Sequence, residues 1–352
     1  MDKSALETIS GDPGAFLQKL DLVTRRALFV RVTRQELERA SFLDERLGMQ
    51  GREGFWASLG QVGEIASALA NDSRAPCFIF HIGHCGSTLL SRLLDTYPDV
   101  LGLREPVPLR DLAITERDLG SPLGRLNQEQ WDALLHASLK LLCRPFSSRQ
   151  QTVIKATSSC NNLVGPILRH ESKAKAVLLC QRLEPHLATI LKGAGGGMDA
   201  LQSAPARLAF LHDFLDDNRL RLHAMETSEM VAMGWVAELA RFHQLMAGSS
   251  IGPRLLLLDF ERMLADMPNE LTNVLHHLGL SDDRDPERSA KQVAVMRSYA
   301  KSPTHGYSPG DRKHDLDLSR RTFAADIERG MRWAIRLIES SPRLAVLRSM
   351  LE

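Results

Sequence analysis

Five short apolar runs stand out along the chain, and each one ends at or just before a polar or charged residue. Runs of this length are too short for helices. Because polar residues do not alternate within them, they are typical of strands buried on both faces of a parallel sheet. The predicted strands cover residues 77–82, 100–103, 152–155, 176–180 and 254–259.

Segments with apolar residues at helical spacing lie between these runs. The first places Leu89, Leu90, Leu93 and Leu94 on one face of a helix. Buried strands that alternate with helices predict an α/β fold, in which helices flank a parallel sheet. Further helices are predicted over residues 131–142, 205–247 (two or three of them), 268–278 and from about 323 to the C-terminus.

The first 74 residues show helical spacing and no recognisable chemistry. We therefore predict a helical N-terminal extension over residues 1–74, followed by an α/β domain over residues 75–352. The polar and proline-containing turn cluster at 71–76 marks the boundary. A glycine-rich stretch at 193–197 predicts a mobile loop.

The stretch at 77–91 carries the strongest chemical signal. A buried strand is followed by Gly83 and Gly86 and then by a helix that begins near Ser87 and Thr88. A strand, a glycine turn and a helix N-terminus together present free backbone N–H groups to a phosphate. The spacing differs from the G-x-x-x-x-G-K-[ST] loop of ATP and GTP enzymes, because Ser87 stands where the lysine would be.

Polar residues directly follow three other predicted strands. Glu105, Lys155 and Arg182 come at or just after the ends of these strands, as the glycine turn does after the first. The carboxyl ends of parallel strands meet at one edge of the sheet, where ligands bind. A phosphate loop, two cations and a carboxylate at one edge favour group transfer from a phosphate-containing donor, with the carboxylate as proton acceptor.

Composition narrows the function classes. The chain has 352 residues, a net charge of +1 and 43% hydrophobic residues, which is ordinary for a globular protein and gives no general signal for nucleic acid or a membrane surface. Its five cysteines are scattered, as in a reducing compartment. We find no signal peptide or membrane-spanning run and expect a cytoplasmic protein.

Five motifs in order resemble the sulfotransferase superfamily that uses 3′-phosphoadenosine 5′-phosphosulfate (PAPS), in particular its bacterial and tyrosylprotein branches. The resemblance spans roughly residues 77–302 and implies the P-loop NTPase-like sulfotransferase fold. The motifs are the glycine turn with its helix start, the segment 93–100 with Glu105, the pair Ile154-Lys155, the strand that ends in Arg182, and the segment 255–280.

The resemblance also implies roles for individual residues. Glu105 corresponds to the catalytic base, Lys155 to a lysine that contacts the donor, and His84 stands where the family usually has lysine or arginine. Arg182 corresponds to the arginine of the 3′-phosphate site, with Thr189 beside the position of the family's serine. The donor site is expected to comprise Gly83, His84, Cys85, Gly86, Ser87, Thr88, Arg182, Thr189 and Lys301.

Other interpretations remain open at this stage. An ATP-dependent small-molecule kinase would need magnesium and Asp259, and a nucleotide-binding protein without activity would follow if His84 cannot replace the usual cation. His81, His84 and Cys85 suggest a metal site only weakly, because no fourth ligand is evident, and we expect none. The acceptor, a small molecule or a peptide, and the oligomeric state do not follow from the sequence.

Overall fold

The computed structural model describes the chain except for residues 1–8, 10, 48–50, 70–73, 283–284 and 352. Its centre is a five-stranded parallel sheet in the order β5-β6-β4-β7-β8. This confirms the predicted α/β class. The strands are β4 (Cys77–His81), β5 (Val100–Arg104), β6 (Gln151–Lys155), β7 (Lys175–Cys180) and β8 (Leu255–Asp259).

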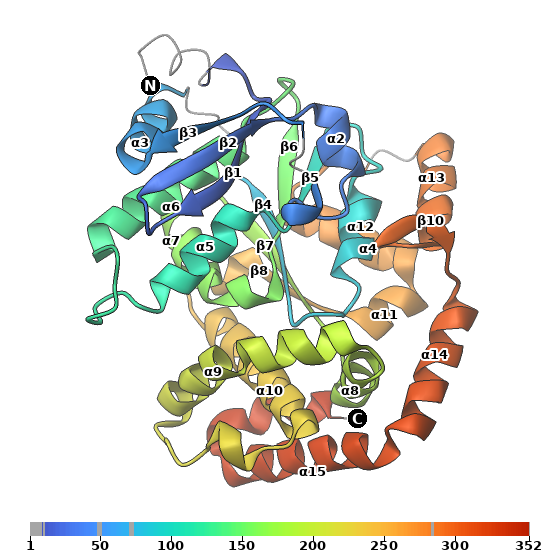
Figure 1. The fold of residues 1–352 in the computed structure, drawn as a ribbon. Coiled ribbons are helices and arrows are strands. Elements are labelled where there is room, and N and C mark those ends of the chain that lie inside the picture. Colours follow the sequence, from blue (N-terminus) through green and yellow to red (C-terminus); the bar gives the residue numbers. More distant parts are fainter. Residues whose placement is uncertain (1–8, 10, 48–50, 70–73, 283–284, 352) are drawn as a thin grey trace.

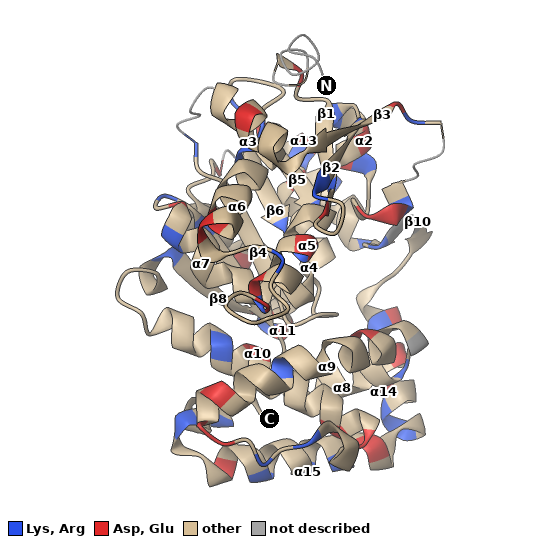
Figure 2. Cartoon of the chain, turned by 60° about the vertical axis from the view of Figure 1, so that its left-hand side comes forward, with Lys and Arg blue, Asp and Glu red and all other residues tan. Residues whose placement is uncertain are grey.

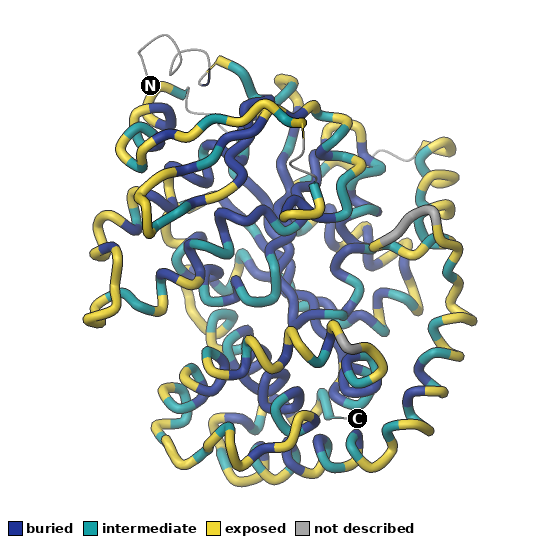
Figure 3. The backbone as a smooth tube through the Cα atoms, in the orientation of Figure 1, coloured by how far each residue is buried: buried dark blue, intermediate teal, exposed yellow. Residues whose placement is uncertain are grey.

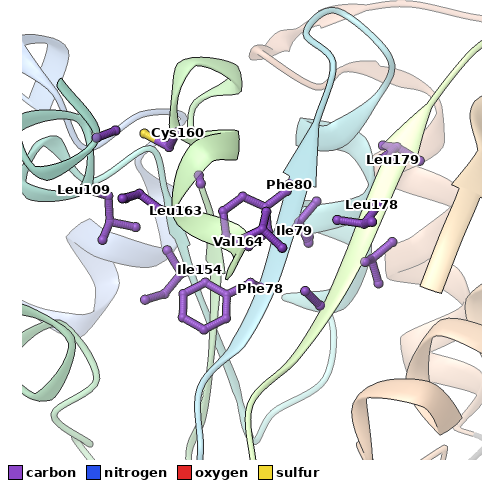
Figure 4. Packing of buried hydrophobic residues seen from close by; sticks show 14 of the residues in the cluster. Phe78, Ile79, Phe80, Leu109, Ile154, Cys160, Leu163, Val164, Leu178 and Leu179 are labelled. Carbon is purple, nitrogen blue, oxygen red and sulfur yellow. The ribbon is translucent and has the colours of Figure 1, made fainter. Parts of the chain in front are cut away.

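The central strands are buried on both faces, as their continuous apolar runs predict. All residues of β4 and β5 are buried. Phe78 and Phe80 point to the same face of β4, with ring centroids 5.7 Å apart. Figure 4 shows them among side chains from the neighbouring strands and from the segment around Val164. Burial of these closely packed apolar side chains stabilises the sheet and so holds the carboxyl ends of its strands in place.

Helices surround this sheet, and Figure 3 shows buried residues concentrated at its centre with exposed turns outside. Helix α4 packs on β4, β5 and β6, and α12 packs on β7. The helices are α2 (Arg34–Arg39), α3 (Leu59–Ala68), α4 (Ser87–Leu94), α5 (Val107–Glu116), α6 (Gln128–Leu142), α7 (Val164–His170), α8 (Leu183–Leu191), α9 (Ala194–Leu215), α10 (Thr227–Met246), α11 (Phe260–Ala265), α12 (Met267–Leu278), α13 (Pro286–Met296), α14 (Pro309–Thr322) and α15 (Ala324–Ser340).

Four of the helices form a group of their own, and short elements complete the chain. Helices α8, α9, α10 and α15 group together at the lower end of Figure 1, away from the N-terminal segment. A two-stranded antiparallel hairpin, β9 (Ser298–Tyr299) and β10 (Ser302–Gly306), precedes α14. The 3₁₀ helices are η1 (Glu45–Leu47), η2 (Ser158–Leu163), η3 (Leu222–Ala224), η4 (Gly252–Arg254) and η5 (Pro342–Met350).

The prediction of a helical N-terminal extension is wrong for much of its length. Residues 15–31 and 54–58 form an antiparallel sheet of β1 (Ala15–Asp21), β2 (Arg26–Arg31) and β3 (Gly54–Ser58), although α2 and α3 are helical as expected. A register shift between Leu17 and Lys19 hides the alternation of β1. The β1–β2 turn contains Leu22 and Val23 and carries no glycine or proline signal. Parts of the predicted extension, including residues 71–73 of its boundary cluster, lie outside the described residues.

Buried arginines join the N-terminal segment to the central sheet. Arg104, at the end of β5, donates hydrogen bonds to the carbonyls of Leu37 (3.2 Å), Glu38 (2.6 Å) and Ala40 (2.7 Å) and pairs with Asp95. Arg144 donates to the carbonyls of three residues in the segment 9–15. Both sheets contribute to one hydrophobic core, so the segment is an integral part of the structure.

The predicted mobile loop at 193–197 is also wrong, because this stretch begins helix α9, with Gly193 as its N-cap. A Cβ atom on Gly196 would lie 3.0 Å from the Ile190 carbonyl oxygen, so the close approach of α8 and α9 requires a small residue there.

Charges are mixed over the surface, and Figure 2 shows Lys and Arg interspersed with Asp and Glu. In the part of the chain that is described, no helix has the length and apolar character needed to cross a membrane.

Candidate active site

The candidate site lies beyond the carboxyl end of β4, between the two halves of the central sheet. Strand β4 pairs with β6 on one side and β7 on the other, and the chain crosses from one half to the other after β6. A crevice opens at such a switch point in parallel α/β sheets. The segment 82–86, which links β4 to α4, occupies this place.

This segment is a loop of left-handed backbone. Gly83, His84 and Gly86 have φ angles of 91°, 53° and 79°. A Cβ atom on Gly86 would lie 2.0 Å from the Phe260 ring, so only glycine fits there. Gly86 is the N-cap of α4 and provides no side-chain cap, which leaves the first-turn N–H groups of Ser87 and Thr88 for a ligand.

His81 holds the loop in shape. The Gly83 N–H donates to its Nδ1 (3.0 Å), and its Nε2 donates to the Ala156 carbonyl (2.9 Å), so both ring nitrogens are engaged. Burial lowers the pKa of His81 well below its usual value, which keeps the ring neutral. His81 therefore positions the loop, a role that sequence reasoning missed. In the described part of the chain, no three His, Cys, Asp or Glu side chains are grouped as metal ligands would be.

Glu105 and Lys155 form a buried ion pair at the ends of β5 and β6. The Lys155 ammonium contacts Glu105 Oε1, and the Glu105 N–H donates to the Lys155 carbonyl (2.7 Å). The Lys155 side chain is 1% exposed, whereas that of Glu105 is 16% exposed. Burial lowers the pKa of Lys155, and the Glu105 carboxylate opposes this shift. The pair presents its carboxylate to the site.

His84 lies on the rim of the loop and is half-buried. Its Nε2 lies 3.5 Å from Asp199 Oδ2, on the first turns of α9. The hydrogen bond with His84 lowers the pKa of Asp199 below its ordinary value. Asp199 follows the glycine-rich stretch that the sequence predicted to be a loop, so no signal pointed to this contact.

These groups line a single cavity with a volume of about 580 Å³. This size lies within the range of small-molecule sites, roughly 300–1,000 Å³. The predicted site residues that line it are Gly83, His84, Gly86, Ser87, Thr88, Glu105, Lys155, Thr189 and Lys301.

Two predicted residues do not line the cavity. Cys85 is fully buried, its Sγ donates to the Leu179 carbonyl (3.3 Å), and burial raises the pKa of the thiol to about 12, so the side chain belongs to the core. Arg182 is exposed at the N-cap of α8. Among the described residues its side chain makes no hydrogen bond or ion pair, although its carbonyl accepts a hydrogen bond from the His186 N–H (3.1 Å).

Several lining residues were not predicted for the site. Phe42 and Arg46 come from the N-terminal segment, and Lys192 comes from the end of α8. Lys192 lies 2.9 Å from Asp315, and Arg312 of α14 pairs with Glu261 (3.2 Å from NH1). These residues lie far apart in sequence and follow no motif, so only the fold brings them together.

Asp259, which the kinase interpretation requires, caps a helix. Its Oδ1 accepts a hydrogen bond from the Arg262 N–H (2.9 Å) at the start of α11, and the residue does not line the cavity. This is the local role of an N-cap aspartate.

Comparisons with known proteins find similar structures only at low sequence identity. No protein-family model and no curated protein sequence matches the chain. A sulfotransferase domain from the curacin biosynthetic pathway is 13% identical, with a TM-score of 0.41 over 71% of this chain and 91% of that one. The sulfotransferase domain of a Synechococcus olefin synthase is 16% identical (TM-score 0.38, 72% and 96% covered). A mouse sulfotransferase complexed with PAP is 12% identical (TM-score 0.34, 79% and 93% covered).

These solved structures are sulfotransferases, the class that the sequence motifs resemble. TM-scores below 0.5 carry no argument about activity. Function therefore has to follow from the residues of the cavity.

Proposed function

We propose that the protein is a sulfotransferase that moves a sulfuryl group from PAPS to a hydroxyl or amine acceptor. One observation carries the proposal: the phosphate loop and the Glu105–Lys155 pair open into the same cavity. An anion held at the loop thus lies beside a carboxylate that can accept a proton.

The loop suits the phosphosulfate end of the donor. Its left-handed backbone and the free N–H groups of Ser87 and Thr88 provide donors for phosphate oxygens. The space that a side chain would fill at Gly86 is taken by Phe260, so the backbone itself forms the cradle. The buried hydroxyl residues Ser87 and Thr88 line the same wall.

The 3′-phosphate has two candidate sites. Thr189 and Lys192, at the C-terminal end of α8, both line the cavity, and this Thr189 cluster offers a hydroxyl and a cation. Arg182, which the family resemblance favours, is exposed on the same helix as Thr189 but outside the cavity lining. We assign the 3′-phosphate to the Thr189 cluster. Comparing Lys192→Gln with Arg182→Gln for affinity toward adenosine 3′,5′-bisphosphate (PAP) separates the two assignments.

In the proposed reaction, Glu105 accepts the proton of the acceptor hydroxyl while the acceptor oxygen forms a bond to sulfur. The bond between sulfur and the bridging oxygen of the 5′-phosphate breaks, and PAP leaves with the electron pair of that bond. The Lys155 ammonium and a ring N–H of His84 stabilise the negative charge that develops on the leaving oxygen. No step requires a metal ion.

A nucleotide-binding protein without catalysis is the second candidate, and one observation favours it. Asp199 Oδ2 lies 3.5 Å from His84 Nε2, so a carboxylate already engages the side chain that stands where the family usually has lysine or arginine. In that case PAP would bind but PAPS would not be consumed.

The transfer reaction can be tested with PAPS, a panel of phenols, alcohols and amines, and an excess of EDTA. We expect release of PAP together with sulfated product, and a large loss of both in Glu105→Gln. A requirement for magnesium, or PAP release that persists undiminished in Glu105→Gln, would contradict the proposal. Absence of turnover together with tight PAP binding would support the second candidate.

A further inference from the structure

A second hollow lies next to the cavity and is built mainly by the N-terminal segment. It has a volume of about 590 Å³ and is more open than the cavity. We call it the basic hollow. Its lining residues are Glu36, Arg39, Ala40, Ser41, Phe42, Arg46, Leu47, Arg52 and Lys301.

The charges of the basic hollow are unbalanced toward the positive. Arg52 pairs with Glu36 at 2.8 Å, and Arg46 is held by Asp44, with Nε 2.8 Å from Oδ1. Arg39 and Lys301 are exposed, and within the described residues their side chains have no hydrogen-bond or ion-pair partner. These two cations remain for a ligand with an oxyanion group.

The basic hollow is continuous with the cavity. Phe42, Arg46 and Lys301 line both. The Arg46 guanidinium lies over the Phe42 ring, 3.4 Å from its centroid, and its NH2 is 3.9 Å from Glu105 Oε2. The Arg46 side chain is therefore what lies between a molecule in the basic hollow and the proposed base, Glu105.

The walls of the basic hollow are held by buried and partly buried hydrogen bonds. Arg92 of α4 donates to the Ser41 hydroxyl and to the Ala300 carbonyl, both at 2.7 Å, and so joins the N-terminal wall to the hairpin wall. Arg104 binds the carbonyls at the end of α2, next to Arg39. The hollow is therefore a preorganised part of the fold.

We infer that the basic hollow binds an oxyanion group, a phosphate or a carboxylate, of the acceptor. The inference rests on the proposed function, because it takes Glu105 as the base. The anion pairs with Arg39 and Lys301, and the rest of the acceptor extends past Phe42 so that its hydroxyl meets Glu105. The acceptor class is thus a small hydroxyl compound with an anionic group.

The binding test uses inorganic pyrophosphate on protein saturated with PAP, so that the phosphate loop is occupied. We expect calorimetry to detect pyrophosphate binding that weakens at least five-fold in Arg39→Glu. Arg336→Glu, an exposed residue on α15, is the matched control and should leave binding unchanged. Absence of pyrophosphate binding in the wild type, or equal binding in Arg39→Glu, would overturn the inference.

The acceptor test compares matched pairs: glycerol 3-phosphate with glycerol, and 4-hydroxyphenylacetate with its amide. The first pair reports a phosphate and the second a carboxylate. We expect kcat/KM to be at least ten-fold higher for the anionic member of one pair, and this preference to disappear in Arg39→Glu while the neutral member is unaffected. Equal or better use of the neutral members would overturn the inference.

The two proposals can fail separately. If PAP does not bind, the sulfotransferase proposal and the acceptor role both fall, whereas Arg39-dependent binding of pyrophosphate would still identify an anion site. If PAP binds and PAPS is consumed but Arg39→Glu changes nothing, only the assignment of the basic hollow is wrong.

Discussion

The two larger sheets of the molecule reach the same cavity by different routes. At the ends of β4, β5 and β6 in the parallel sheet lie the proposed phosphate loop, Glu105 and Lys155, respectively. The antiparallel sheet delivers nothing from its strands, and its contribution comes from the segment between β2 and β3, which carries Phe42 and Arg46. The parallel sheet thus supplies the proposed chemistry, and the N-terminal sheet supplies the wall on which an acceptor would lie.

The largest expected effect concerns the parallel sheet. Glu105→Gln removes the proposed base, and kcat should fall by about 10²–10⁴-fold. Affinity for PAP should change little, because the loop is untouched. Since Lys155 loses its buried partner, Glu105→Asp is the control that keeps the charge, and it should retain the fold with an intermediate rate. Normal turnover in Glu105→Gln would contradict the chemical role proposed for this edge of the sheet.

Arg104 tests how firmly the two regions are joined. Arg104→Met leaves Asp95 buried without its cation and removes the hydrogen bonds to the end of α2, which should cost about 3–5 kcal/mol of unfolding free energy. Arg332→Met, which breaks an exposed i,i+4 pair with Glu328 on α15, is the control and should cost about 0.5 kcal/mol. Chemical denaturation measures both. Equal effects would mean that the N-terminal segment is only loosely attached.

Gly86, in the loop after β4, can be compared with Gly279, which has a similar backbone conformation elsewhere in the chain. Gly86→Ala adds a clash with Phe260 to the strain of its positive φ, and we expect a loss of about 2–4 kcal/mol together with loss of PAP binding. Gly279→Ala has a similar φ of 73° but open space around the new methyl group, and it should cost about 1 kcal/mol with normal binding. Equal losses would exclude the close approach to Phe260.

A smaller effect concerns the contact between β1 and α5. Asp111 accepts a hydrogen bond from the Leu20 N–H (2.9 Å), and burial raises its pKa to about 6. The folded state therefore binds this proton more tightly than the unfolded state, so stability falls as the pH rises from about 4 to about 6. Asp111→Asn keeps an acceptor for Leu20 and should gain about 2 kcal/mol above pH 6. If the free energies of unfolding of the two proteins changed with pH in the same way across this range, the raised pKa of Asp111 would be contradicted.

The two regions also differ in what the sequence reveals. The strands of the parallel sheet are continuous buried runs, and those runs predicted all five of them and the edge at which their polar residues meet. The N-terminal strands are short, a register shift interrupts β1, and the turn after β1 is apolar, so local patterns favoured helices. Tertiary packing decides the conformation there.

The candidate site divides in the same way. Residues at or just after strand ends, such as Lys155 and Glu105, were found because topology fixes where strand ends meet. Phe42, Arg46, Lys192 and Asp199 were missed because they reach the cavity through packing between distant segments. Arg182 is the opposite case, because it follows a strand and was predicted for the site, but its side chain does not line the cavity. The catalytic roles themselves remain predictions.

The central claim is that the phosphate loop and its neighbours hold a PAPS-type nucleotide. Calorimetric titration of the full chain with PAP and with ATP plus magnesium tests it most directly. We expect PAP to bind at least ten-fold more tightly than ATP, without magnesium, and Gly86→Ala to abolish this binding. Preference for ATP, or equal affinity for the two nucleotides, would contradict the account.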